Sequence, residues 1–149
     1  MSLPASSPSG YLPPGIHRAT LSEIVARFGS ATPRRQTLAD RLQTLITLAR
    51  ATGRLRRVFV WGSFVTDKSF PGDLDVFLLM EAGFDKIFSS LPSEQRDIFD
   101  HGRVRLLFEA DVFWATEAIG EEELASWLSV YQLSRDLVER GIVEVGDDD

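Results

Sequence analysis

The stretch V-F-V-W-G-S-F-V-T-D-K-S-F-P-G-D-L-D-V-F-L-L-M, residues 58–80, decides the fold of this chain. Two apolar runs, 58–61 and 74–80, predict two strands of one sheet. The second run is apolar on both faces beyond Asp75, which predicts a central strand covered by helices on at least one side. The polar loop between the runs opens with Gly62-Ser63 and closes with Asp73-x-Asp75. We expect the chemistry of the protein to lie in this loop.

The two aspartates of this loop predict a cation site. Successive side chains of a strand point to opposite faces, so Asp73 and Asp75 point the same way. Two unit charges about 4 Å apart repel by roughly 4 kcal/mol at an effective dielectric near 20, so the pair needs a proton or a cation. Mg²⁺ suits carboxylates that leave room for substrate phosphates. The structural alternative is a turn acid and a strand-edge acid.

Gly62 and Ser63 are the candidate phosphate-binding residues. Glycine allows a ligand to approach the backbone closely, and a turn into a helix N-terminus favours anions. The serine adds a hydroxyl. The alternative is a glycine that serves only to turn the chain.

A third carboxylate is expected from the segment E-A-D-V-F-W-A at 109–115, which predicts a third strand. Its Asp-Val-Phe opening repeats the one at 75–77. Asp111 would lie beside the first two aspartates if the strands are neighbours. Glu109, on the same face by parity, is the rival ligand, and a turn acid at a strand start is the structural alternative. We favour Asp111.

Composition places the chain among globular proteins with a single domain. It has 149 residues, of which 44% are hydrophobic, and its net charge of −6 argues against non-specific binding of duplex nucleic acid. The absence of cysteine excludes disulfides and thiolate sites. We expect residues 1–10, rich in Ser and Pro, to be a disordered N-terminal segment, 11–145 to be the domain and 146–149 to be an acidic tail. With no leader pattern and no long apolar run, we expect a cytoplasmic protein without membrane contact.

The remaining elements follow from capping signals and apolar spacing. The capping box Thr20-x-x-Glu23 opens a helix that is expected to end near Phe28. Further helices are expected over 33–52, over 84–91 with a break at Pro92, from 93 to about 107, and over 121–138, and an edge strand is expected over 142–145. His17 and His101 have no partner motif, so each is expected to be a surface histidine or one with satisfied hydrogen bonds, and not a catalytic base.

The order helix, strand, Gly-Ser, Asp-x-Asp strand, helices and a strand with a third aspartate resembles the nucleotidyltransferase superfamily, which includes DNA polymerase beta and the small bacterial minimal nucleotidyltransferases. The motifs L-P-P-G at 12–15 and W-G-S-F-V-T-D-K-x-x-P-x-D-x-D at 61–75 are similar to those of a group of small bacterial proteins in that superfamily. The resemblance spans about residues 11–145. It implies an α/β nucleotidyltransferase fold with a small mixed sheet flanked by helices.

In that superfamily the Gly-Ser holds the phosphates of the nucleotide, and three carboxylates hold two Mg²⁺ ions. The resemblance therefore implies Gly62, Ser63, Thr66 and Lys68 as nucleotide-binding residues, and Asp73, Asp75 and Asp111 as catalytic residues and metal ligands. The expected activity is transfer of a nucleoside monophosphate from a nucleoside triphosphate, with ATP the expected nucleotide, to an acceptor hydroxyl on a protein, RNA or small molecule. The commoner minimal pattern has an Arg and a Gly after the Gly-Ser and a Ser before the first Asp. Here Thr66, Asp67 and Gly72 stand at those positions, and the loop is one residue shorter.

Two other functions are consistent with parts of this pattern. The altered loop favours a nucleotidyltransferase-like module that binds without catalysis, for instance as one component of a toxin–antitoxin pair, and the intact carboxylates favour an enzyme. Because the domain has little room for an acceptor-binding region, a partner protein could complete the cleft. A phosphatase of the haloacid-dehalogenase type also uses Asp-x-Asp, but its acids follow an apolar strand, whereas here the apolar run follows the acids.

Overall fold

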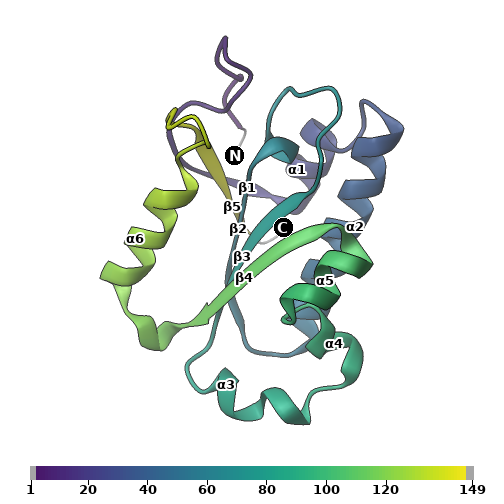
Figure 1. Ribbon diagram of the computed structural model, residues 1–149, viewed down its shortest axis with the longest axis vertical. Helices are drawn as coiled ribbons and strands as arrows, with labels where there is room; N and C mark the ends of the chain where they lie inside the picture. The colour runs from purple at the N-terminus through teal and green to yellow at the C-terminus, as the bar shows by residue number, and fades with distance from the viewer. Residues whose placement is uncertain (1–2, 147–149) are drawn as a thin grey trace.

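A five-stranded mixed sheet forms the centre of the structure, with the strand order β1-β5-β2-β3-β4 (Figure 1). The computed structural model describes residues 3–146, so Met1, Ser2 and most of the expected acidic tail, residues 147–149, lie outside it. The strands are β1 (Gly15–Thr20), β2 (Leu55–Trp61), β3 (Leu74–Met80), β4 (Ala110–Thr116) and β5 (Gly141–Gly146). Strand β3 is antiparallel to β2 and parallel to β4, while β5 is antiparallel to β2 and parallel to β1. The expected α/β class with a small mixed sheet is confirmed, and β3 lies between β2 and β4 as predicted.

Six α-helices accompany the sheet within residues 3–146: α1 (Leu21–Phe28), α2 (Pro33–Ala51), α3 (Phe84–Ile87), α4 (Ser93–Asp97), α5 (His101–Phe108) and α6 (Glu121–Tyr131). The predicted capping box begins α1, because the Thr20 hydroxyl accepts a hydrogen bond from the Glu23 N–H at 3.1 Å and the Glu23 carboxylate accepts one from the Thr20 N–H. None of these helices combines the length and the apolar character that crossing a membrane requires.

Alternation along the strands divides the core between the two faces of the sheet. Figure 1 shows α1, α2 and α5 on one side of the sheet and α6 on the other. Val76 and Leu78 of β3 belong to the cluster on the side of α2, whereas Phe77 and Leu79 belong to the cluster that includes Leu124 of α6. Asp75 therefore lies on the same face as Phe77, toward the α6 side.

Strand β5 differs from its expected place at the sheet edge. It lies between β1 and β2, and all six of its residues are buried. The edge is formed by β1, which was not expected as a strand because the polar run H-R-A-T has no regular apolar alternation. Helix α6 ends at Tyr131, short of the expected residue 138, and the turn that follows includes Leu137 with a φ of 61°.

Candidate functional site

Asp75 of β3 and Asp111 of β4 occupy paired positions in neighbouring parallel strands. On the other side of β3, Asp75 is paired with Trp61, the last residue of β2. Because neighbouring strands lie about 4.8 Å apart and paired side chains point the same way, the two carboxylates share one face of the sheet. The structure thus brings the expected third aspartate beside the Asp-x-Asp pair.

The carboxyl group of Asp75 is the most strongly perturbed acid of the site. Its pKa is raised from 3.8 to about 7, first by burial and then by repulsion from Asp73 and Asp111. The positive charges of Arg140 and Arg105 act in the opposite direction but do not offset these effects. A carboxyl that is hard to ionise beside two others favours a bound proton or cation, as the spacing of the pair predicted.

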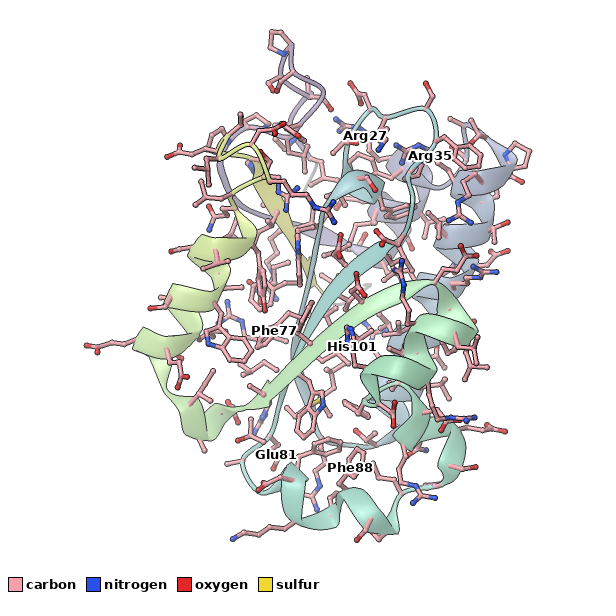
Figure 2. The ribbon with its side chains drawn as sticks, viewed as in Figure 1. Arg27, Arg35, Phe77, Glu81, Phe88 and His101 are labelled. Atoms are coloured by element: carbon pink, nitrogen blue, oxygen red, sulfur yellow. The ribbon has the colours of Figure 1, made fainter. Side chains whose placement is uncertain are left out.

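Helix α5 directs two side chains toward these carboxylates. Arg105 donates a hydrogen bond to Asp73 Oδ2 at 2.7 Å and lies 3.7 Å from Asp111 Oδ2. His101, one turn earlier on the same face of the helix, has its Nε2 3.8 Å from Asp111 Oδ1. Figure 2 shows His101 beside β4. Neither residue was predicted for the site, and His101, expected at the surface, has an exposed side chain that nevertheless lies next to Asp111.

Gly62 allows Asp75 to occupy its position. Its φ is 83°, a conformation that side-chain-bearing residues rarely adopt, and a Cβ built here would lie 2.1 Å from Asp75 Oδ2. Glycine is therefore required for two reasons, the backbone conformation and the closeness of the carboxylate. The group that approaches Gly62 closely is the carboxylate of Asp75, whereas the expected approach of a phosphate to this glycine stays a prediction.

Ser63 follows at the start of a single 3₁₀ turn, Ser63–Val65, in place of the expected helix N-terminus. A turn of three residues has too few aligned peptides to provide the dipole of a helix end, so that part of the phosphate-binding argument is not met. Thr66 fixes this turn, since its hydroxyl donates to Ser63 O at 2.7 Å and accepts from the Lys68 N–H. Thr66 is buried, whereas the side chain of Lys68 is exposed.

A cleft of about 980 Å³ opens beside the aspartates. Its walls include all four of the expected nucleotide-binding residues, Gly62, Ser63, Thr66 and Lys68, together with Asp73 and Asp75. Asp111 is not among the residues that line it, because β4 lies on the far side of β3 from β2. Asp73 and Asp75 therefore mark the edge of the cleft. Asp111, Arg105 and His101 lie on the side of these two aspartates that is away from the cleft.

The N-terminal segment forms one wall of this cleft. Within it the Ser7 N–H donates to Tyr11 O at 2.7 Å and the Gly10 N–H donates to Ser7 O at 2.8 Å, which closes a turn. The Asp67 N–H donates to Gly10 O at 3.0 Å, and the Ser6 hydroxyl donates to Asp67 Oδ1 at 3.0 Å. Part of the segment expected to be disordered thus makes specific contacts with the loop after β2.

Two further arginines contribute positive charge to the cleft. Arg135 and Arg140, from the segment between α6 and β5, line it together with Lys68. Arg140 is half-buried, donates a hydrogen bond to Tyr131 O at 3.2 Å, and acts electrostatically on Asp75. Neither arginine was predicted for the site, because both reach it only through the pairing of β5 with β2.

Glu109, the rival third carboxylate, is directed elsewhere. It precedes β4 in a left-handed conformation with a φ of 51°, so the parity that would place it on the face of Asp111 does not apply. Its carboxylate accepts hydrogen bonds from Arg34 at 3.1 and 3.3 Å and from Arg41, both on α2. The hydrogen bonds from these two arginines lower the pKa of Glu109 to about 2.

Within residues 3–146, no group of three or more His, Cys, Asp or Glu side chains is arranged to hold a metal ion. Asp73 is paired with Arg105, so a complete protein cage does not exist. The donor set still fits Mg²⁺ bound by one or two carboxylates and completed by the phosphates of a substrate, which is the usual mode for this ion. Asp75, half-buried and hard to ionise, is the carboxylate that a cation would stabilise most.

Comparison with known proteins gives a family and no further relative. No curated protein and no solved structure matches the chain. A sequence family described as a family of unknown function, DUF6932, matches residues 4–146, which include every residue of the cleft and its carboxylates. The chain belongs to the DUF6932 family.

Proposed function

We propose that this protein binds a nucleoside triphosphate with Mg²⁺ and transfers its nucleotidyl group to an acceptor hydroxyl, on a fold of the nucleotidyltransferase type. The observation that carries the proposal is that Asp73 and Asp75 line the cleft together with Gly62-Ser63, while Asp111 of the neighbouring strand is paired with Asp75. The raised pKa of Asp75 supports a cation site there. Positive charge from Lys68, Arg135 and Arg140 in the same cleft suits a triphosphate.

The residues divide into three roles in this proposal. Asp73 and Asp75 would hold Mg²⁺ together with phosphate oxygens of the substrate, and Asp75 would release its proton when the ion binds. Ser63 would donate its hydroxyl to a phosphate oxygen, while Gly62 keeps the backbone close to Asp75. Asp111, outside the cleft wall, would face the acceptor. The basic residues of the cleft would neutralise the charge of the leaving pyrophosphate.

In the reaction the acceptor oxygen forms a bond to the α-phosphorus while the bond from that phosphorus to the β-phosphate oxygen breaks. The proton of the acceptor hydroxyl would pass to the Asp111 carboxylate, and pyrophosphate leaves into the cleft. When bound, Mg²⁺ lowers the pKa of the attacking hydroxyl and stabilises the charge on the leaving group. The residues of the chain position the triphosphate and the acceptor, and their positive charges complement the charge of the phosphates.

A second candidate is a binding module that holds a nucleotide or a partner protein without catalysis. The observation that favours it is the ion pair between Arg105 and Asp73, because a guanidinium already neutralises one of the two carboxylates. In this case Mg-ATP would bind without transfer of any part of it. A component of a toxin–antitoxin pair is one form that such a module could take.

The test uses ATP labelled in the α-phosphate and, separately, in the γ-phosphate, incubated with the protein, Mg²⁺ and a cell extract. Nucleotidyl transfer moves only the α label to protein, RNA or a small molecule, and releases pyrophosphate. Transfer of the γ label would indicate a kinase and overturn the proposal. Binding of Mg-ATP by calorimetry with no transfer of either label would favour the binding module.

Two variants control this experiment. Asp75→Asn removes a charge at the site and is expected to abolish transfer. Asp40→Asn removes the same charge from an exposed position on α2 and is expected to leave transfer unchanged. Equal transfer by parent and Asp75→Asn would show that the labelling does not come from this site.

A further inference from the structure

Two consecutive arginines at the start of α2 hold the backbone of the loop between β2 and β3. Figure 2 labels Arg35 where α2 meets this loop. Five loop carbonyls, those of Phe64, Thr66, Lys68, Pro71 and Gly72, accept hydrogen bonds from Arg34 or Arg35. Residues on both sides of this span, Ser63 and Asp73, line the cleft.

Arg35 is a buried charge held by neutral partners. Its residue is 5% exposed, and its guanidinium donates to Phe64 O at 2.7 Å and to the carbonyls of Thr66 and Lys68 at 2.6 Å each. A fourth bond reaches Phe28 O at the end of α1. Among the described residues no carboxylate forms an ion pair with it. Burial of a charge is unfavourable unless its donors are satisfied, and here loop carbonyls satisfy most of them.

Arg34 holds the other end of the loop. Its guanidinium donates to Pro71 O at 3.1 Å and to Gly72 O, directly before Asp73. The same side chain donates to Glu109, which also accepts a bond from Arg41. Glu109 thereby fixes the direction of Arg34. Although the Glu109 carboxylate does not reach the aspartates, it influences the position of Asp73 through Arg34 and the loop.

The direction of these carbonyls determines where the next N–H groups point. In a trans peptide the C=O of one residue and the N–H of the next point in opposite directions. Because Thr66 C=O points to Arg35, the Asp67 N–H points away from α2, and it donates to Gly10 O in the N-terminal wall of the cleft. Because Gly72 C=O points to Arg34, the N–H of Asp73 also points away from that arginine.

We infer that Arg34 and Arg35 are positioning residues that hold the loop of residues 64–72 in the shape that presents Ser63 and Asp73 to the cleft. Only the planar fork of arginine can serve several carbonyls from one side chain. Lysine keeps the charge but has a single ammonium group, so it cannot span carbonyls of Phe64, Thr66 and Lys68 together. The consequence of this inference for ligand binding depends on the proposed function, whereas its consequence for the loop does not.

Hydrogen–deuterium exchange of the full chain without nucleotide tests the inference directly. Arg35→Lys is expected to raise exchange in residues 64–72, and at Asp67 in particular, by roughly tenfold or more, the effect of losing one hydrogen bond to a charged group. The control is Arg57→Lys, which alters the bonds of Arg57 to Glu144 at 2.8 and 3.0 Å, away from the loop. It is expected to leave exchange in 64–72 unchanged.

Two results would overturn the inference: unchanged exchange in 64–72, or an equal rise in the loop, α2 and β3. The second would indicate a general loss of stability with no local role. If Arg35→Lys does not fold, Arg34→Ala decides, because its side chain is partly exposed and its loss is expected to raise exchange only at residues 72–75. No rise at 72–75 in that variant would equally overturn the inference.

Affinity for Mg-ATP separates this inference from the proposed function. Arg35→Lys is expected to weaken binding by roughly tenfold, with Arg57→Lys close to the parent. Failure of the parent to bind any nucleoside triphosphate would overturn the proposed function, while the exchange result would still decide the role of the arginines. Unchanged affinity in Arg35→Lys together with a loosened loop would show that the loop shape does not serve binding, and would overturn that part of the inference.

Discussion

Asp75 and Asp111 are paired across two parallel strands, with no residue of another strand between them. A parallel pair places both side chains on one face at the same level, so the repulsion between the carboxylates depends on the register of the strands. A slip by one residue would turn Asp111 to the other face, where Val112 now lies in the core beside α2. The apolar residues that follow both aspartates therefore hold the carboxylates together.

Asp75→Asn is expected to stabilise the metal-free protein near neutral pH. The pKa of Asp75 is raised from 3.8 to about 7 in the folded protein, so between these values the folded state binds the proton more tightly than the unfolded state. The free energy of unfolding therefore falls as the pH rises from about 4 to about 7, by at most roughly 4 kcal/mol, and solvent at this partly exposed group reduces that figure. Melting curves over this pH range should show the fall for the parent and a smaller one for Asp75→Asn.

The opposite result has a clear meaning. If Asp75→Asn lowers the melting temperature at neutral pH without metal, the ionised carboxylate stabilises the fold. The interpretation of Asp75 as a repelled member of a cation site would then be wrong. Asp40→Asn, at an exposed position on α2, is the control for removal of a charge alone.

Asp111→Asn is expected to affect nucleotidyl transfer, whereas Glu109→Gln is expected to affect the stability of the fold. Asp111→Asn should abolish nucleotidyl transfer, because it removes the carboxylate that is proposed to accept the proton of the acceptor hydroxyl. It should have little effect on stability, because the ion-pair contacts of Asp111 are 3.7 and 3.8 Å long. Glu109→Gln should reduce stability, because Glu109 accepts bonds from Arg34 and Arg41. The pKa of Glu109 is lowered to about 2, so this stabilisation is present above its unfolded pKa and is lost as the pH falls toward 2.

Transfer assays and melting curves of both variants check this contrast. The stability difference between parent and Glu109→Gln should be present at pH 7 and shrink on acidification below about pH 4. Full loss of transfer in Glu109→Gln, with Asp111→Asn active, would exchange the roles of the two acids.

The strands that carry the carboxylates could be predicted because their signal is local. Apolar runs mark β3 and β4, and the parity of Asp75 follows from its place in the strand. Parity failed at Glu109 because a left-handed residue between helix and strand ends the alternation, and nothing in E-A-D-V identifies that conformation. Strand β1 could not be predicted from its own residues. It is a strand because it pairs with β5, which is far away in the sequence, and such pairing depends on tertiary contacts.

The positive residues around the site could not be predicted for a related reason. Arg105 reaches Asp73 because α5 packs beside β4, and Arg35 reaches the loop because the first turn of α2 lies next to the carbonyls of Thr66 and Lys68. In the sequence, each is one of at least two arginines on its helix. The i, i+4 spacing of His101 and Arg105 shows that they share a face, but it does not show that the face meets the carboxylates.

Arg105→Gln is expected to raise the affinity for Mg²⁺ in the absence of nucleotide. The guanidinium competes with a cation for Asp73, to which it donates at 2.7 Å. The pair is partly exposed, so its removal should change stability by no more than about 1 kcal/mol and raise metal affinity by up to about fivefold. Arg103→Gln is a matched control, since Arg103 lies on the same helix and pairs with Asp97 at 2.9 Å. Titration with Mg²⁺ alone measures the affinity of each protein for the ion. If Arg105→Gln binds Mg²⁺ no more tightly than Arg103→Gln and the parent do, the prediction is wrong.

Ser63→Ala and Gly62→Ala separate phosphate binding from turn formation. Loss of a hydrogen bond to a charged group is expected to weaken Mg-ATP binding by roughly 1.5 to 3 kcal/mol in Ser63→Ala, with little change in melting temperature. Gly62→Ala should lose both binding and stability, because its Cβ would lie 2.1 Å from Asp75 Oδ2.

Each of these variants has a matched control. Ser126→Ala removes an exposed hydroxyl from α6, whose bond to Glu122 O lies outside the cleft. Gly83→Ala imposes a similar backbone strain at a φ of 91° but meets nothing within 4 Å, so it separates strain from the clash with Asp75. Titration of Mg-ATP against all four variants and the parent decides the question. If Ser63→Ala binds Mg-ATP as tightly as the parent and Ser126→Ala do, the hydroxyl of Ser63 has no phosphate contact and Gly62-Ser63 only shapes the turn.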